Sequence, residues 1–228
     1  MKQALINCPS LANSSLLELE EDIRQFWNSG VRWFHIDIMD GHYVPNLCYP
    51  VRLVADLKAK YPQAIADVHM MVTDPAAYIE PLRAAGADYV SFHADSTHFV
   101  IRSLRAIREV GMKAGIVLNP SQQVDVIRPY LDWVDLVVLM TVEPGFAGQK
   151  FMVESLPRLE ELSKLREETG KEFLISIDGG NNYPNVQPCV RRGANLFVTG
   201  VYTVYRQPDG IPAACQRFEQ EMRKGLVE

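Results

Sequence analysis

Apolar runs alternate with amphipathic segments along the whole chain. The apolar runs are rich in β-branched and aromatic residues and are bounded by turn residues, which is typical of strands. The segments between them repeat apolar residues at helical spacing. The predicted strands are 4–8, 33–39, 65–72, 89–93, 114–118, 136–141, 173–177 and 196–198. The predicted helices are 16–28, 51–60, 76–85, 99–110, 124–131, 157–169, 186–192 and 211–225.

The first predicted helix, 16–28, has recognisable start and stop signals. Ser14 and Ser15 are candidate N-caps, since a hydroxyl oxygen there can accept a hydrogen bond from the first turn. Leu16 opens a stripe of apolar residues at helical spacing, and Gly30 follows as a terminator. The pattern therefore predicts a helix that packs one face on the core from Leu16 onward.

Eight strand–helix units follow one another without a linker or a break in composition. Alternating units of this kind form parallel strands with right-handed crossovers. Eight of them predict an α/β protein with a single (β/α)8 barrel domain over residues 1–228. An open doubly wound sheet is the alternative. No Gly-x-Gly-x-x-Gly follows the first strand, which argues against dinucleotide binding.

Composition narrows the class of function. The net charge of −5 gives no basic field, so neither nucleic acid nor an anionic membrane is an expected partner. We find no apolar run long enough to span a membrane and no basic-then-apolar leader, so neither a spanning helix nor a signal peptide is expected. The four cysteines are scattered without a Cys-x-x-Cys pair, which argues against a thiolate zinc site and suits a reducing cytoplasm.

The strand predicted at 33–39 carries unusual chemistry on one face. Side chains alternate along a strand, so His35, Asp37 and Met39 share one face and apolar residues share the other. A buried carboxylate beside a buried imidazole is costly unless both are paired. One explanation is that they hydrogen-bond to each other. The other is that they bind a divalent metal ion.

Neighbouring strands offer the further ligands that a metal site requires. His69 lies on the inward face of the third strand and Asp178 ends the seventh, at the barrel end where active sites form. Together with His35 and Asp37 they form a set of two imidazoles and two carboxylates, which suits Zn²⁺, Fe²⁺, Mn²⁺ or Co²⁺ better than Mg²⁺ or Ca²⁺. We interpret Asp67 as an interior hydrogen-bonding group and His93 as a structural or supporting residue.

Methionines and glycines complete the predicted mouth of the barrel. Met39, Met71 and Met140 lie on inward faces near strand ends; each alone fits as core filler, and together they suit a dry site around a carbanion-like intermediate. Because a glycine has no side chain, a phosphate can approach its backbone N–H group closely. Barrels often bind phosphate in this way with the loops after their last strands. The glycine-rich runs are Gly145-Phe146-Ala147-Gly148, Gly179-Gly180 and Thr199-Gly200.

These residues resemble one known family over nearly the whole chain. The matching motifs are Pro9-Ser10-Leu11, His35-x-Asp37-x-Met39-Asp40-Gly41-His42-x-Val44-Pro45-Asn46, Asp67-Val68-His69-Met70-Met71, Leu118-Asn119-Pro120, Pro144-Gly145-Phe146-x-Gly148-Gln149 and Asp178-Gly179-Gly180. Together they resemble the ribulose-phosphate 3-epimerase family, which includes allulose-6-phosphate 3-epimerases. The second-strand block and the Pro-Gly-Phe-x-Gly-Gln loop are the most specific of these motifs.

The resemblance implies a cytoplasmic, homo-oligomeric isomerase, a dimer or a hexamer, that inverts C3 of a ketose phosphate and interconverts D-ribulose 5-phosphate and D-xylulose 5-phosphate through an enediolate. It implies Asp37 and Asp178 as the two acid/base groups, and one divalent ion (Zn, Fe, Mn or Co) as the cofactor. The implied metal ligands are His35, Asp37, His69 and Asp178. The implied substrate contacts are Ser10, Met39, His69, Met71 and Met140. The implied phosphate contacts are Gly145, Phe146, Ala147, Gly148, Gly179, Gly180, Gly200 and Val201.

The chain departs from the family at the phosphate end. The family usually carries a serine close to the glycine that closes the eighth strand, whereas this chain has Val201 directly after Gly200. The departure bears on the identity of the ketose phosphate more than on the reaction. A sensor that binds sugar phosphates without catalysis, an allulose-6-phosphate 3-epimerase or another barrel enzyme such as an aldolase are the alternatives. A Schiff-base aldolase needs a lysine at a strand end, and the strand ends considered above carry none.

Overall fold

The apolar runs form eight parallel strands in one sheet, in the order β1-β8-β7-β6-β5-β4-β3-β2. This computed structural model describes residues 5–226. A parallel bridge between Ser10 and His35 joins β1 to β2 and closes the barrel. The strands are β1 (Ile6–Pro9), β2 (Trp33–Met39), β3 (Ile65–Met71), β4 (Tyr89–His93), β5 (Lys113–Leu118), β6 (Leu136–Met140), β7 (Leu174–Asp178) and β8 (Leu196–Thr199). The predicted (β/α)8 barrel is confirmed. Ala4, the first residue of the first predicted strand, lies outside the described residues.

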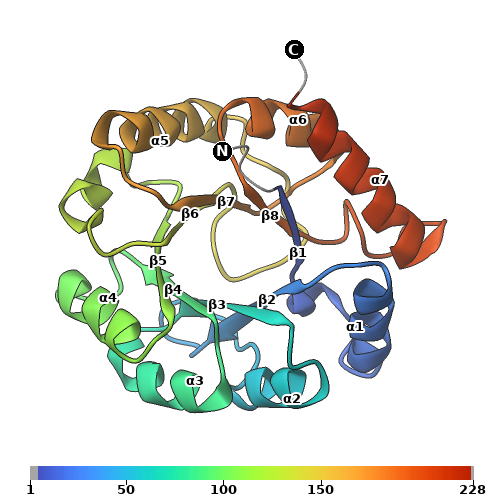
Figure 1. Ribbon diagram of the computed structural model, residues 1–228, viewed down its shortest axis with the longest axis horizontal. Coiled ribbons are helices and arrows are strands. Elements are labelled where there is room, and N and C mark those ends of the chain that lie inside the picture. Colours follow the sequence, from blue (N-terminus) through green and yellow to red (C-terminus); the bar gives the residue numbers. More distant parts are fainter. Residues whose placement is uncertain (1–4, 227–228) are drawn as a thin grey trace.

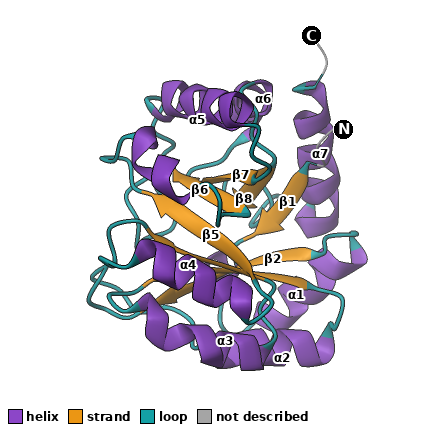
Figure 2. Cartoon of the chain, turned by 60° about the vertical axis from the view of Figure 1, so that its left-hand side comes forward, coloured by secondary structure: helices purple, strands orange, loops and turns teal. Residues whose placement is uncertain are grey.

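A helical segment follows each strand, and these segments form a ring around the barrel (Figure 1). The side view shows the strands enclosed between helices of this outer layer (Figure 2). The α-helices are α1 (Leu19–Asn28), α2 (Arg52–Lys60), α3 (Ile79–Ala85), α4 (Val100–Glu109), α5 (Ser155–Thr169), α6 (Tyr183–Arg191) and α7 (Gly210–Lys224). The 3-10 segments are η1 (Leu11–Asn13), η2 (Pro75–Tyr78) and η3 (Val124–Tyr130).

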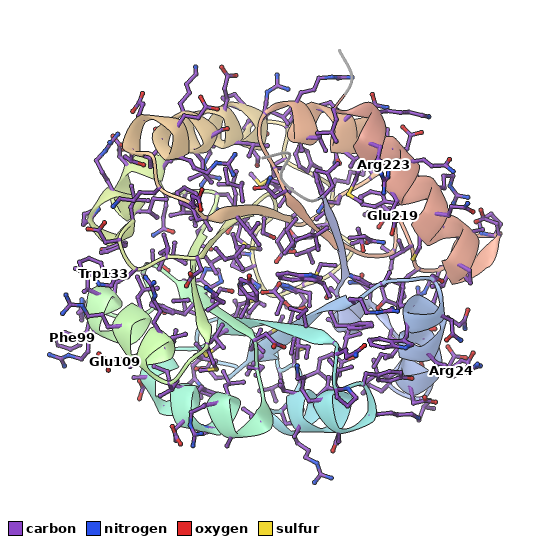
Figure 3. All side chains as sticks on the ribbon, viewed as in Figure 1. Arg24, Phe99, Glu109, Trp133, Glu219 and Arg223 are labelled. Atoms are coloured by element: carbon purple, nitrogen blue, oxygen red, sulfur yellow. The ribbon has the colours of Figure 1, made fainter. Side chains whose placement is uncertain are left out.

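Strand alternation divides the core into two layers. Outward residues such as Phe34, Ile36 and Ile38 of β2 belong to the large apolar cluster between strands and helices. Inward residues of β6, such as Leu136 and Val138, pack in a smaller cluster inside the barrel. Charged side chains at the outer surface point away from both layers, as the labelled residues of the helices show (Figure 3). The inward polar residues of β2 and β3 therefore lie inside the barrel, in the same inner layer as Leu136 and Val138.

Several predicted helix boundaries were wrong. Helix α1 begins at Leu19, and Leu16 is 74% exposed, because Ser14 donates its hydroxyl to the Asp22 carboxylate and caps no helical turn. The segment predicted as helix 124–131 is a 3-10 helix with Pro129 inside it, since proline cannot donate the N–H that an α-helix needs there.

Three other predicted helices begin earlier than predicted or change type along their length. Helix α6 begins at Tyr183 because Asn182 and Asn185 form a reciprocal capping box. Helix α5 begins at Ser155, two residues before the predicted start. The predicted helix 76–85 is η2 followed by α3. No helix of residues 5–226 combines the length and the apolar character needed to cross a membrane.

Candidate active site and metal centre

The register of β2 against β3 brings acids and imidazoles together. The two parallel strands pair His35 with Asp67 and Asp37 with His69. All four side chains point into the barrel and are buried. Strand β6 pairs Met140 with Asp178, the last residue of β7. Met140 and Asp178 end their strands, and Asp37 and His69 lie two residues before the ends of β2 and β3, near the carboxyl ends where the sequence predicted the site. His35 and Asp67 lie two residues deeper in the same strands.

Four predicted ligands converge on one point. One donor atom each from His35, Asp37, His69 and Asp178 lies within 4.8 Å of the others. Nε2 of His35 is 3.4 Å from an Asp37 oxygen and 3.6 Å from an Asp178 oxygen. Nδ1 of His69 is 3.4 Å and 3.3 Å from the same two carboxylates. The arrangement is a ring of two nitrogens and two oxygens around a common centre.

The two imidazole nitrogens that face this centre have no hydrogen-bond partner within residues 5–226. Both Nε2 of His35 and Nδ1 of His69 are fully buried. A buried polar atom without a partner is costly, and a divalent ion would satisfy both nitrogens at once. The donor set of two imidazoles and two carboxylates thus fits a divalent transition metal ion. It favours the metal explanation over simple pairing of His35 with Asp37.

The opposite nitrogen of each imidazole is held by a neighbour. Nδ1 of His35 is 2.7 Å from Asp67 Oδ2, and Nε2 of His69 is 2.9 Å from Nε2 of His93. Such contacts fix the ring orientation and the tautomer of a metal ligand. The interpretation of Asp67 as an interior hydrogen-bonding group and of His93 as a supporting residue is confirmed.

Charges in the cluster stabilise one another. Burial raises the pKa of Asp37, but the imidazoles of His35 and His69 outweigh burial and hold that pKa well below its usual range. Burial lowers the pKa of His35, but Asp37 and Asp67 outweigh it and raise that pKa well above the ordinary value. Burial also lowers the pKa of His93, and His69 lowers it further. Asp37 is therefore an ionised carboxylate and His93 a neutral imidazole at pH 7.

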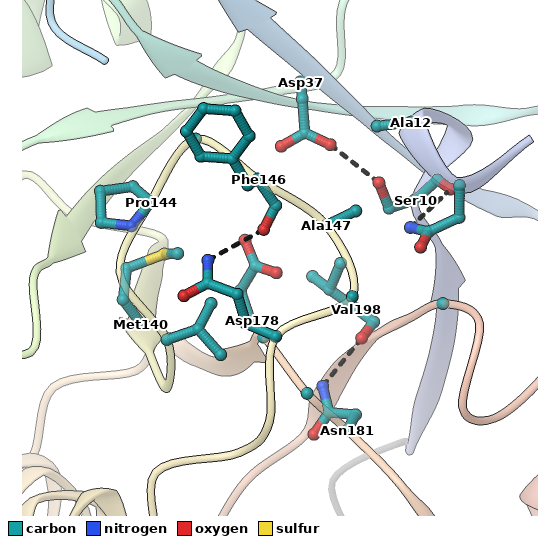
Figure 4. Close-up of a pocket in the computed structure, with 18 of the residues that line it drawn as sticks. Ser10, Ala12, Asp37, Met140, Pro144, Phe146, Ala147, Asp178, Asn181 and Val198 are labelled. Carbon is teal, nitrogen blue, oxygen red and sulfur yellow. Dashed lines mark hydrogen bonds between the residues drawn. The ribbon is translucent and has the colours of Figure 1, made fainter. Parts of the chain in front are cut away.

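Above the cluster a pocket of about 640 Å³, including its part open to solvent, extends to the loops after β6, β7 and β8. Figure 4 shows Asp37 and Asp178 reaching into it from different strands, with the loop after β6 passing over it. Ser10 lies at its wall and donates its hydroxyl to Asp37 Oδ2 at 2.8 Å. The three predicted methionines, Met39, Met71 and Met140, also line it. All the predicted catalytic, substrate and phosphate residues therefore meet at one pocket, except that His35 and His69 lie beneath its floor.

The glycines after β7 are required by their surroundings. Gly180 has φ of +62°, and a Cβ there would lie 2.3 Å from the backbone nitrogen of Phe151. A Cβ on Gly179 would lie 2.4 Å from a Val142 methyl. The N–H groups of Gly179, Gly180 and Val201 have no acceptor in residues 5–226. Backbone donors of this kind suit an anion.

Gly200 differs from the other predicted phosphate residues. Its N–H donates to the hydroxyl of Thr203 at 3.0 Å, so that donor is already used within the β8–α7 loop. Sequence reasoning missed Thr203, and it did not list Asn13, Asn181 or Tyr202 as site residues, although these three line the pocket. Among the residues that line the pocket there is no arginine or lysine. Backbone dipoles are the donors at its glycine-rich end.

Comparisons with known proteins agree with this geometry. A model of the ribulose-phosphate 3 epimerase family matches residues 6–204. The ribulose-phosphate 3-epimerase of Bacillus subtilis (strain 168) is 41% identical over 208 residues, covering 88% of this chain and 92% of the relative. That of Escherichia coli (strain K12) is 35% identical over 228 residues, covering 100% and 98%.

Solved structures show the same fold at low sequence identity. The crystal structure of 3-hexulose-6-phosphate synthase from Salmonella typhimurium aligns with a TM-score of 0.75 at 18% identity, covering 97% of this chain and 100% of that one. The crystal structure of 3-keto-L-gulonate-6-phosphate decarboxylase from Vibrio cholerae aligns with a TM-score of 0.69 at 15% identity, covering 98% and 99%. At these identities the likeness concerns the barrel and not the chemistry.

Proposed function

The chain belongs to the ribulose-phosphate 3-epimerase family, and from that premise we propose that it interconverts D-ribulose 5-phosphate and D-xylulose 5-phosphate. One observation carries the proposal: Asp37 and Asp178 reach the same pocket from β2 and β7, with carboxylate oxygens within 4.8 Å of a common set of buried imidazoles. The predicted resemblance and the expected isomerase class agree with the names of the relatives.

Epimerisation at C3 needs two acid/base groups. The proton α to the C2 carbonyl is removed from one face, and a proton is returned to C3 on the opposite face. We assign these roles to Asp37 and Asp178, which would take and return the C3 proton on opposite sides of a substrate held in the pocket. One carboxylate must be ionised when the other carries a proton, because one group removes the C3 proton and the other returns it.

The ligands of a divalent ion would be His35, Asp37, His69 and Asp178. When bound, the ion would supply positive charge that stabilises the developing enediolate. Such help is needed because even an unperturbed aspartate, with a pKa of ~3.9, is a weak base for a carbon acid, and the pKa of Asp37 is lower still. Ser10 orients Asp37 by its hydrogen bond. The methionines line the pocket with groups that donate no competing proton and exclude water.

The phosphate would lie at the glycine-rich end of the pocket, against Gly145 to Gly148, Gly179, Gly180 and Val201. Gly200 would line this end of the pocket without donating to the phosphate, since its N–H donates to the Thr203 hydroxyl. The expected homo-oligomeric state and cytoplasmic location stay predictions.

A panel of phosphorylated ketoses followed by NMR in deuterated water tests the proposal. We expect D-ribulose 5-phosphate to epimerise with deuterium incorporated at C3, and the unphosphorylated sugar to lose much of its kcat/KM because remote binding energy supports the chemical step. Faster turnover of allulose 6-phosphate would reassign the substrate. Binding of ketose phosphates without deuterium exchange would indicate a sensor instead.

A further inference from the structure

In the loop after β6, residues 144–149, three carbonyl groups accept hydrogen bonds, while the N–H groups make none within residues 5–226. The Gly145 carbonyl accepts from Asn46 Nδ2 at 2.8 Å, and the Phe146 carbonyl accepts from Gln149 Nε2 at 2.9 Å. The Gly148 carbonyl accepts from the Tyr202 hydroxyl at 2.7 Å. By contrast, the N–H groups of residues 145–149 have no acceptor in residues 5–226.

This division matters for an anion in the pocket. A carbonyl oxygen carries partial negative charge and repels a phosphate dianion, whereas an N–H group attracts one. The C=O and the N–H of one trans peptide point in opposite directions. Donors that hold these three carbonyls therefore also fix the direction of the N–H groups of Phe146, Ala147 and Gln149. The loop is arranged for anion binding by side chains from three separate places in the chain.

Tyr202 is the donor that spans the pocket. It belongs to the β8–α7 loop, lines the pocket together with Gly148, and is 42% exposed. Its bond to Gly148 connects two loops that are 54 residues apart in sequence. The neighbouring Val201 offers a free N–H at the same end. Tyr202 thus joins the two loops that bear free donors.

We propose that Tyr202 is a positioning residue for the phosphate group: its hydroxyl clasps the β6–α5 loop to the β8–α7 loop and holds their N–H groups toward the anion. The proposal rests on the proposed function for the identity of the ligand, a sugar phosphate. The clasp itself requires only that the glycine-rich end binds a phosphate dianion. Tyr202 then determines affinity for the phosphate end of the substrate, and the chemical step at C3 remains with the aspartates.

Tyr202→Phe tests the clasp, because it removes the hydroxyl and keeps the ring. Tyr130→Phe is the matched control. Tyr130 ends η3 and does not line the pocket, and its hydroxyl makes no hydrogen bond within residues 5–226. We expect Tyr202→Phe to weaken the Kd of inorganic phosphate, measured by calorimetry, by roughly 5–10-fold, as the loss of one net hydrogen bond implies. KM for the phosphorylated ketose should rise by a similar factor, with kcat within about twofold.

A second readout does not depend on activity. Lys150 is exposed directly after the loop, so the rate of tryptic cleavage there reports how often the loop opens. We expect faster cleavage at Lys150 in Tyr202→Phe than in the wild type or the control. An unchanged phosphate Kd or an unchanged cleavage rate overturns the clasp. If the wild type does not epimerise the ketose phosphate but Tyr202→Phe still weakens phosphate binding and speeds cleavage, the proposed function is refuted and the clasp stands.

Discussion

Nε2 of His93 lies 2.9 Å from Nε2 of His69, on the opposite side of that ring from the Nδ1 that faces Asp37 and Asp178. If Nδ1 of His69 binds a metal ion, its Nε2 carries the proton and donates to His93. The Tyr43 ring packs on His93 at a centroid distance of 4.6 Å, which holds the acceptor in place. His93 would thus determine the tautomer of a proposed metal ligand from outside the four-residue cluster.

Replacing His93 with leucine should weaken metal affinity by roughly 10–100-fold, the usual effect of losing such a supporting contact. His93→Gln should lose less, because its amide oxygen can accept the same proton. Competition with a chromophoric chelator measures both affinities. His98→Leu, at an exposed position, is the control. A His93→Leu variant that binds metal as tightly as the wild type would contradict the assigned role.

Metal removal should abolish activity. The unpartnered nitrogens of His35 and His69 and the two carboxylates around them form a donor set that could hold an ion. We expect a strong chelator to eliminate epimerisation, and Zn²⁺, Fe²⁺, Mn²⁺ or Co²⁺ to restore it. Activity is measured on protein whose metal content has been verified by mass spectrometry. Full activity in the verified metal-free protein would refute the four-ligand site.

Asp40 connects the ends of β2 and β3, which carry three of the four proposed ligands. One carboxylate oxygen accepts from the N–H groups of His42 and Tyr43, each at 2.8 Å, and the other accepts from the N–H and hydroxyl of Thr73 at 2.8 and 2.9 Å. Burial raises the pKa of Asp40, but these hydrogen bonds outweigh it and hold the pKa well below its usual range.

The lowered pKa of Asp40 predicts a pH dependence of stability. Its contribution is fully present above the unfolded value of ~3.9 and is lost as the pH falls through the lower folded pKa. Asp40→Asn should lower the free energy of unfolding at pH 7 by roughly 1 kcal/mol and flatten its decline below about pH 4. Urea denaturation at several pH values measures this. Asp56→Asn, in an exposed pair with Arg52, is the control and should change little.

The strand pattern predicted the central site because strand geometry leaves few choices. The strand 33–39 has the predicted bounds, and alternation alone places His35 and Asp37 on the barrel face. Parallel register then puts His69 beside Asp37. Alternation is a local property of one strand, so the sequence contains it, whereas the register of β2 against β3 is supplied by the fold.

The same reasoning failed where contacts are distant or where two local interactions compete. Leu16 fits the helical period, yet the Ser14 hydroxyl bonds Asp22 and the helix begins at Leu19. No pattern shows that the Tyr202 hydroxyl meets the Gly148 carbonyl, because that contact depends on how two loops close over the barrel. Likewise, Gly200 matches the glycine-rich signal, while Thr203 takes its N–H.

The two-base assignment makes the sharpest prediction for the reaction. If Asp37 and Asp178 serve opposite faces of C3, each handles the proton of one epimer. Asp37→Asn and Asp178→Asn keep the side-chain shape but remove proton transfer, so each should slow epimerisation by roughly 10²–10⁴-fold or more. Asp56→Asn, on the outer surface of α2, should epimerise as the wild type does.

Loss of activity alone is ambiguous, because both aspartates are also proposed metal ligands. Metal content must therefore be measured on each variant, and deuterium incorporation at C3 followed for each epimer separately. A metal-loaded variant that keeps the base for one epimer should exchange that epimer's proton while failing to invert it. The other variant should do so only with the opposite epimer, since its remaining carboxylate faces the other side of C3. Metal-loaded variants that lack this asymmetry, or that epimerise normally, would show that the C3 proton is moved by some other group.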